Sequence, residues 1–287
     1  MLPNFLFIGP DKAGSKWLHD IFGRHPECFV PRIADPYFFD RHYDLGLGWY
    51  QGLFAAAGPG ARAVGEFSHD YLFSDDAADR IQRDLPEVRL LTCLREPVDR
   101  AFSQYLSMIR AGMIQEPFEM ALKNVPALRE NSRYGVHLRR YLGRFPRERL
   151  KVVFYDQLVS APREFAREIF TFLGISFIED LPYEERVNPA GAPRYVWLAR
   201  VVQRGAHLAR SWGLAELVGV LKRGVARNVV YREYRPGERP RLSEQTAQAL
   251  RAEFAEDLAV VERELGVDLG AWRRGERLTV TRAGAGG

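Results

Sequence analysis

Cysteine, histidine and long apolar runs are scarce in this 287-residue sequence. It has only two cysteines, Cys28 and Cys93, and six histidines scattered along the chain. Two separated cysteines exclude a disulfide framework, and we expect two reduced thiols. No cysteine or histidine cluster has the spacing of a zinc site, so we predict no metal. No apolar run approaches the roughly 18 residues that cross a bilayer, so we expect no stable membrane insertion.

The sequence also lacks a large excess of positive or negative charge. The 41 lysines and arginines outnumber the 37 acidic residues by four, which is too little to indicate a nucleic-acid partner. The same small excess suits an anionic ligand in a basic cleft. The first residues show neither a basic segment nor a small-residue cleavage site, so we expect no signal peptide and a cytoplasmic location. Oligomeric state is left open.

What the sequence does contain is an alternation of strand and helix patterns. Apolar runs at 4–9, 61–67, 87–94 and 149–158 predict strands. Helical patterns follow at 15–24, 74–85, 96–112, 134–145, 161–175 and 244–265. This order predicts an α/β fold: one domain over 1–278, with a P-loop-like three-layer α/β/α arrangement around a mostly parallel sheet. We expect 194–227 to form a helical cap with a basic face, or else an interfacial membrane helix, and 279–287 to be a flexible tail.

The first strand and helix enclose a glycine-containing loop, in the stretch "FLFIGPDKAGSKWLHDIF". A helix N-terminus behind such a loop offers unpaired N–H groups to an anion, although the pattern also fits a plain tight turn. An ATP site needs a hydroxyl after the lysine and a carboxylate at another strand end, to hold magnesium. Here Trp17 follows Lys16, and the strand at 87–94 ends in Arg95. The loop therefore favours a phosphate ligand held without metal.

Four ordered segments carry a family resemblance over residues 4–112: "GPDKAGSKWL", "ADPYFFDRHYDLGLGWY", "GEFSHDYLF" and "CLREPVDRAFSQY". Together they resemble sulfotransferases that use 3′-phosphoadenosine 5′-phosphosulfate (PAPS), and most closely the heparan sulfate branch. The segments resemble, in turn, that family's 5′-phosphosulfate loop, its acceptor-side FF segment, a strand end with a glutamate, and its 3′-phosphate segment.

The resemblance implies roles for the donor side. Lys12 would contact the sulfuryl group and the oxygen that bridges it to the departing phosphate. Arg95 and Ser103 would bind the 3′-phosphate, and Arg239 is the candidate in a later loop that closes over the nucleotide. The remaining donors to the 5′-phosphate would come from the loop and the helix start: Ala13, Gly14, Ser15, Lys16 and Trp17.

The resemblance also implies roles for the acceptor side. Asp35 stands at the position of the family's catalytic base, with Glu66 and His69 as rivals near the same cleft. Asp40 would orient the acceptor or pair locally. The residues predicted to contact the acceptor are Tyr37, Phe38, Asp40, Glu66 and Tyr71. Three family groups that face an anionic sugar chain are replaced, by Ala34, Tyr37 and Phe67, which argues against a heparan-like acceptor.

Taken together, these patterns predict a PAPS-dependent sulfotransferase with no metal requirement. It would transfer the sulfuryl group in line to a hydroxyl, or less readily an amine, of a carbohydrate, lipid or natural product. Two alternatives stay open: a P-loop small-molecule kinase that uses ATP and magnesium, and a non-catalytic module that binds nucleotides or polyanions.

Overall fold

The computed structural model describes residues 1–31, 33, 35–185, 192–193, 231–232 and 237–279. Its main sheet has the order β2-β3-β1-β4-β5, and every pairing is parallel. The strands are β1 (Phe5–Gly9), β2 (Cys28–Phe29), β3 (Ala63–Phe67), β4 (Arg89–Leu94) and β5 (Leu150–Phe154). The four predicted strands are present. The two-residue β2 has no sequence signal, because it is too short to show a period.

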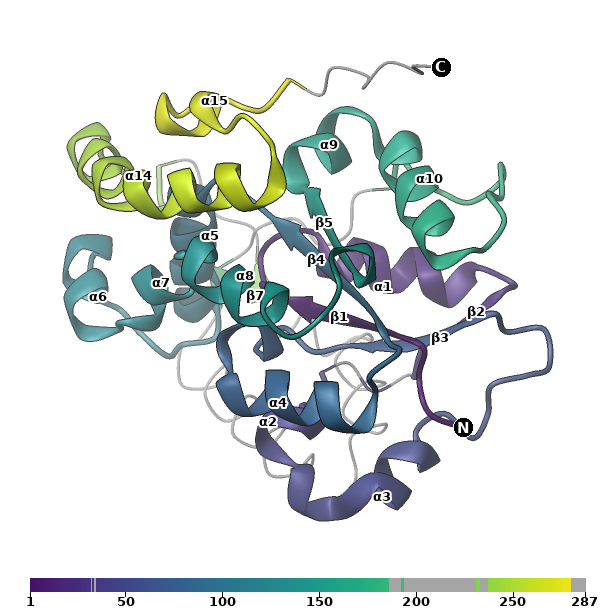
Figure 1. The fold of residues 1–287 in the computed structure, drawn as a ribbon. Coiled ribbons are helices and arrows are strands. Elements are labelled where there is room, and N and C mark those ends of the chain that lie inside the picture. Colours follow the sequence, from purple (N-terminus) through teal and green to yellow (C-terminus); the bar gives the residue numbers. More distant parts are fainter. Residues whose placement is uncertain (32, 34, 186–191, 194–230, 233–236, 280–287) are drawn as a thin grey trace.

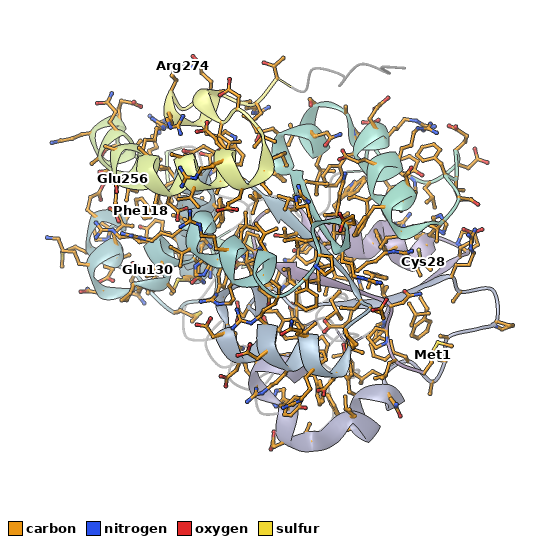
Figure 2. The ribbon with its side chains drawn as sticks, viewed as in Figure 1. Met1, Cys28, Phe118, Glu130, Glu256 and Arg274 are labelled. Carbon is orange, nitrogen blue, oxygen red and sulfur yellow. The ribbon has the colours of Figure 1, made fainter. Side chains whose placement is uncertain are left out.

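Helices cover both faces of this sheet, as Figure 1 shows. On one face lie α1 (Ser15–Arg24) and α10 (Pro162–Leu173), and on the other α4 (Asp75–Asp84) and α8 (Tyr134–Leu142). Side chains of β1 alternate between the two cores: Leu6 and Ile8 join one, Phe5 and Phe7 the other. Figure 2 shows side chains filling the space between the layers. The predicted three-layer α/β/α fold is confirmed.

A third apolar cluster lies beside the sheet and joins distant segments. It packs α5 (Pro97–Arg110), α6 (Phe118–Asn124) and α7 (Ala127–Glu130) against α14 (Glu244–Leu265). The long α14 begins and ends as its sequence predicts. Ser243 accepts a hydrogen bond from the Thr246 N–H at 3.1 Å, and Gly266 closes the helix in the left-handed conformation. The C-terminal part of the described chain is thereby fixed beside α5.

Several short elements have no clear sequence signal. They are α2 (Phe38–Arg41), α3 (Gly46–Gly52), α9 (Tyr155–Ser160), α15 (Gly270–Arg273) and the antiparallel pair β6 (Ala192–Pro193) and β7 (Tyr231–Arg232). The strand expected at 149–158 is wrong in its second half, because β5 ends at Phe154 and α9 follows. Asp156 of α9 accepts a hydrogen bond from the buried Trp272 indole at 3.1 Å. The two residues are 116 positions apart in the sequence, so local sequence cannot reveal this contact.

Two expectations fall outside the described residues: the helical cap over 194–227 and nearly all of the tail, at 280–287. Within the described ranges, no helix is both long and apolar enough to cross a membrane.

Candidate active site

The carboxyl ends of β1, β3 and β4 lie side by side at the topological switch point of the sheet, where the strand order reverses. The chain runs from β1 toward β2 and β3 on one side, then crosses to β4 and β5 on the other. In open α/β sheets, ligands bind outside the carboxyl ends of strands at such a point. The segments that follow these three strands hold Lys12, His69 and Arg95. Topology therefore gathers three of the four resemblance segments at one edge.

The loop between β1 and α1 is tightly packed and left-handed at three residues. Gly9, Lys12 and Gly14 have φ values of 115°, 66° and 92°. A Cβ on Gly9 would lie 2.0 Å from the His69 carbonyl oxygen, and one on Gly14 would lie 2.5 Å from Leu158 Cδ2. Only glycine suits both positions. No side chain caps the N-terminus of α1, so its first N–H groups face the loop as an anion site requires.

Arg95 braces this loop from the end of β4. Its Nη1 donates to the Lys12 carbonyl at 3.2 Å, and its guanidinium lies 4.8 Å from the centre of the Tyr155 ring. Arg95 Nη2 pairs with Asp99 at 3.4 Å, one helical turn before the half-buried Ser103 on α5. Arg95 Nε is buried and has no hydrogen-bond partner among the described residues. A phosphate beside Arg95 and Ser103 would supply an acceptor for it.

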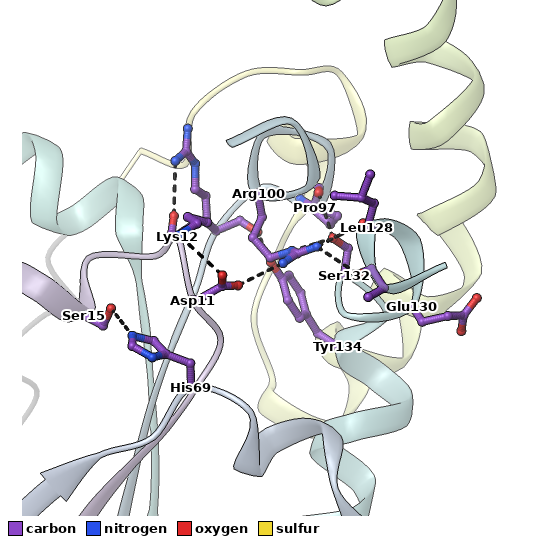
Figure 3. A network of polar contacts seen from close by, with 12 residues as sticks. Asp11, Lys12, Ser15, His69, Pro97, Arg100, Leu128, Glu130, Ser132 and Tyr134 are labelled. Carbon is purple, nitrogen blue, oxygen red and sulfur yellow. Dashed lines mark hydrogen bonds and ion pairs between the residues drawn. The ribbon is translucent and has the colours of Figure 1, made fainter. Parts of the chain in front are cut away.

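Lys12 is held by a chain of charges that sequence reasoning missed. Its Nζ lies 3.5 Å from Asp11 Oδ2, and Asp11 Oδ1 accepts from Arg100 Nη1 at 3.2 Å. Arg100 is fully buried and also donates to Ser132 Oγ at 2.7 Å and to the Leu128 carbonyl at 3.0 Å. Figure 3 shows this network of polar contacts, which extends from the loop to the turn before α8. The only sequence signal was an acid inside a basic loop, together with a second arginine after Arg95.

Asp35 and His69, two of the predicted candidates for the base, form one ion pair through Asp35 Oδ1 and His69 Nδ1. The other ring nitrogen, Nε2, lies 2.7 Å from Ser15 Oγ at the start of α1. Burial of the ring disfavours its charged form, but the Asp35 carboxylate outweighs this and raises the pKa of His69 above 6.5. The start of α1, next to the glycine loop, and a titratable histidine are therefore in direct contact.

Glu66 is buried behind this pair and away from the loop. It accepts hydrogen bonds from Ser68 Oγ at 2.8 Å and Tyr50 Oη at 3.3 Å. Burial raises the pKa of Glu66 to about 8, against the hydrogen bond from Ser68. Phe38 and Tyr71, two further predicted acceptor contacts, are also fully buried in this core. All three would have to become exposed to touch an acceptor, so in this structure they support the site from behind.

Tyr37 and Asp40 lie nearer the surface, around Arg41. The Arg41 guanidinium stacks on the Tyr37 ring at 4.1 Å, lies 3.4 Å from Asp40 Oδ2 and pairs with Asp70. Burial raises the pKa of Asp40 to about 6, despite the opposing charge of Arg41. The positive charge of Arg41 is thus already neutralised by the carboxylates of Asp40 and Asp70.

The other predicted donor residues differ in what they can offer. Ala13 is buried in the loop and offers its backbone, and Lys16 is exposed on α1. The Trp17 indole is turned inward: it donates to the Tyr183 carbonyl at 3.1 Å and packs against Phe165. Trp17 can therefore serve an anion only through its backbone. Arg239 is exposed in a turn before α14.

Fold and site together define a class: a parallel α/β protein with an anion-binding loop, an arginine at the neighbouring strand end and an acid–histidine pair touching the loop. Among the described residues, no group of three or more histidine, cysteine or acidic side chains is arranged to hold a metal ion. In P-loop kinases, magnesium is held by a hydroxyl that follows the loop lysine and by a carboxylate at a strand end. Here Trp17 follows Lys16, and Arg95 follows the end of β4.

Comparison with known proteins agrees with this class. Residues 54–180 match the sulfotransferase family. Human heparan sulfate glucosamine 3-O-sulfotransferase 3B1 is 31% identical over 186 residues, which are 62% of this chain and 47% of that protein. The mouse bifunctional heparan sulfate N-deacetylase/N-sulfotransferase 4 is 27% identical over 202 residues, covering 61% of this chain and 22% of that protein. The chain spans about half the length or less of these curated relatives.

Among solved structures, a sulfotransferase from Alicyclobacillus acidocaldarius superposes with a TM-score of 0.70 at 25% identity. The match covers 96% of this chain and all of that one. The chain is therefore similar to sulfotransferases in sequence and fold, and the resemblance expected from its four motifs is confirmed.

Proposed function

We propose that this protein is a sulfotransferase that uses PAPS and transfers its sulfuryl group to a hydroxyl. The observation that carries the proposal is the contact between Ser15 of the anion loop and His69, which is itself paired with Asp35. A sulfuryl donor on the loop would lie next to a group able to take the acceptor's proton. The resemblance to sulfotransferases supports the same assignment.

In this mechanism the chain's residues divide the work between donor and acceptor. The N-terminus of α1 and Ser15 hold the 5′-phosphate, and Arg95 with Ser103 holds the 3′-phosphate. Lys12 stabilises the negative charge that grows on the bridging oxygen as the sulfur–oxygen bond breaks. The Asp35–His69 pair removes the proton from the attacking hydroxyl. Asp35 orients the ring and favours its charged form, which makes the two residues one functional base.

The acceptor surface supports a substrate of low charge. Arg41 is engaged by Asp40 and Asp70, and Tyr37 presents an aromatic ring beside it. A strongly anionic chain would meet these carboxylates without a spare cation from this cluster, whereas a sugar or another cyclic alcohol can stack on an aromatic ring. We therefore propose a neutral carbohydrate, lipid or natural-product hydroxyl, rather than a highly sulfated glycan.

The donor is tested by thermal melting. Adenosine 3′,5′-bisphosphate at 100 times its Kd should stabilise the protein by about 2.7 kcal/mol, whereas ATP with magnesium should do so only at much higher concentration. The reverse order would favour a kinase.

Transfer is tested with radiolabelled PAPS and a panel of neutral and anionic acceptors. Lys12→Ala should lower turnover by roughly 100-fold or more, because a charged donor to the transition state is removed. Lys123→Ala on α6 is the matched control and should leave turnover unchanged. Full turnover by Lys12→Ala would refute its role. Bisphosphate binding without transfer to any acceptor would favour a binding module.

A further inference from the structure

Ser15 stands at the junction of the two halves of the site. It is the first residue of α1, is nearly buried, and places its Oγ 2.7 Å from His69 Nε2 (Figure 3). We propose that Ser15 couples the charge of His69 to an anion on the loop, so that binding a phosphate there is accompanied by proton uptake at His69. This inference rests on the proposed function, in which Ser15 donates to the 5′-phosphate.

The number of hydrogen-bond donors and acceptors on Asp35, His69 and Ser15 requires such a coupling. An ionised Asp35 can only accept, so His69 Nδ1 carries a hydrogen in the pair. When the ring is neutral, Nε2 has a lone pair, and the single Ser15 hydrogen is directed to it. When the ring is charged, Nε2–H donates to Ser15 Oγ, and the Ser15 hydrogen is released for another acceptor. A phosphate at the loop can thus receive that hydrogen without breaking the Ser15–His69 contact only in the charged state.

The charges around His69 leave both protonation states accessible. Asp35 pairs with the ring directly. Asp11 and Lys12 act on it from the loop with opposite signs, and Asp70 lies next to it in sequence. Burial opposes the charged ring, which also packs edge-on against Phe7 of β1 at 6.2 Å. The carboxylates outweigh burial and raise the pKa of His69 above its ordinary value, and a hydrogen bond that forms only with the charged ring shifts the equilibrium further in that direction.

The coupling sets which state of the donor complex reacts. A charged ring cannot take a proton, so proton uptake on donor binding holds the base back, and transfer proceeds from the fraction with a neutral ring. In that fraction Ser15 donates its hydrogen bond to the phosphate, and the Nε2 lone pair is open to the acceptor. On transfer, the acceptor proton moves to Nε2 and a sulfur–oxygen bond forms to the acceptor. The bond to the bridging oxygen breaks, and its electron pair stays on the departing bisphosphate. His69 is then charged and donates through Nε2–H to Ser15 Oγ, while the Ser15 hydroxyl keeps its hydrogen and continues to donate a hydrogen bond to the product phosphate.

The test measures binding and needs no acceptor. Titration calorimetry with adenosine 3′,5′-bisphosphate, in buffers of different ionisation enthalpy, counts the protons taken up. Between about pH 7 and about pH 9, where the phosphates are ionised, affinity should fall by roughly tenfold. Ser15→Ala should lose most of this dependence, at less than about threefold, whereas Ser15→Thr keeps the hydroxyl and should retain it. His69→Gln should abolish the uptake, and melting temperatures show that each variant is folded.

Equal proton uptake by the wild type and Ser15→Ala would overturn the inference, since phosphate charge alone would then explain it. If the bisphosphate does not bind the wild type at all, the proposed donor fails instead. The same titrations are then made with inorganic pyrophosphate, because the coupling requires only an anion on the loop. Binding of pyrophosphate without proton uptake, or no binding by that anion, would also overturn the coupling.

Discussion

Asp11 places a negative charge inside a loop that presents Lys12, Ser15 and a helix N-terminus to an anion. An acid there repels any phosphosulfate, so its retention needs a local reason. The structure provides one, because the carboxylate joins Lys12 to the fully buried Arg100. Arg100 is itself fixed by Ser132 and the carbonyl of Leu128. Under the proposed function, Asp11 would hold the Lys12 ammonium in position at the expense of affinity for the donor.

This role predicts opposite changes in binding and turnover for Asp11→Asn. Adenosine 3′,5′-bisphosphate should bind about fivefold more tightly, because a nearby like charge is removed. Turnover should fall by roughly tenfold, because Lys12 loses its orienting partner. Calorimetry and initial rates measure the two effects. Asp20→Asn on α1 removes a half-buried acid paired with Arg24, outside the loop, and should change neither. Weaker binding with unchanged turnover would show that Asp11 is a structural residue only.

At the scale of elements, the loop depends on α9, which lies against it from the far edge of the sheet. Gly14 has a φ of 92° and faces Leu158 of α9 and the ring of Tyr155. The Arg95 guanidinium also lies over the Tyr155 ring, so α9 contacts both of the segments that we propose to bind phosphate. The sheet edge thus shapes the loop as much as β1 and α1 do.

Gly14→Ala should therefore damage both stability and binding. Left-handed strain and the collision with Leu158 should lower the free energy of unfolding by about 2 kcal/mol, and bisphosphate affinity should drop by at least tenfold. Chemical denaturation and calorimetry measure these changes. Adding Leu158→Ala should recover part of the affinity, by relieving the collision while the strain remains. Gly48→Ala in α3, where a Cβ meets open space, is the control and should be neutral or mildly stabilising. Loss on the same scale in that control would contradict this account.

At the scale of the whole molecule, ionisable groups around the site lower the free energy of unfolding as the pH rises. Burial raises the pKa of Glu66 to about 8, of Glu96 to about 7 and of Asp40 to about 6. Such carboxyls stay protonated in the folded chain over a range where they ionise in the unfolded chain. The folded state then binds more protons, and its stability falls with rising pH. The raised pKa of His69 acts in the same direction, since its favourable charge is lost as pH rises.

We therefore expect the free energy of unfolding to decrease from about pH 4.5 to about pH 8. Glu66→Gln should flatten this dependence, because its amide does not ionise, while its single carbonyl oxygen can still accept the hydrogen bond from Ser68. Urea denaturation across this pH range measures the slope. Glu87→Gln removes an exposed carboxylate that pairs with Arg149 and should leave the slope unchanged. A Glu66→Gln variant with the wild-type slope would show that Glu66 does not control it.

Local sequence was sufficient for most of the main elements. The apolar runs predict four of the five main strands, since a strand buried on both faces is written as continuous apolar residues. The grouping of Lys12, Ser15, Arg95 and Ser103 was expected from the family resemblance of their motifs, and their roles toward the donor stay a prediction. The same holds for α14, whose cap, apolar stripe and closing Gly266 are all local signals.

Only the tertiary structure decided which candidate bases meet the loop and which acid holds Lys12. Asp35 and His69 are 34 residues apart, and their pairing with Ser15 depends on β3 lying beside β1. Glu66 and His69 belong to the same segment, but Glu66 lies within β3 and is buried in the core, whereas His69 follows the end of the strand and reaches the loop. Asp11 and Arg100 meet because α5 starts where β4 ends, next to the loop. Sequence determines what a local segment can form, whereas contacts between segments follow from how the sheet orders them.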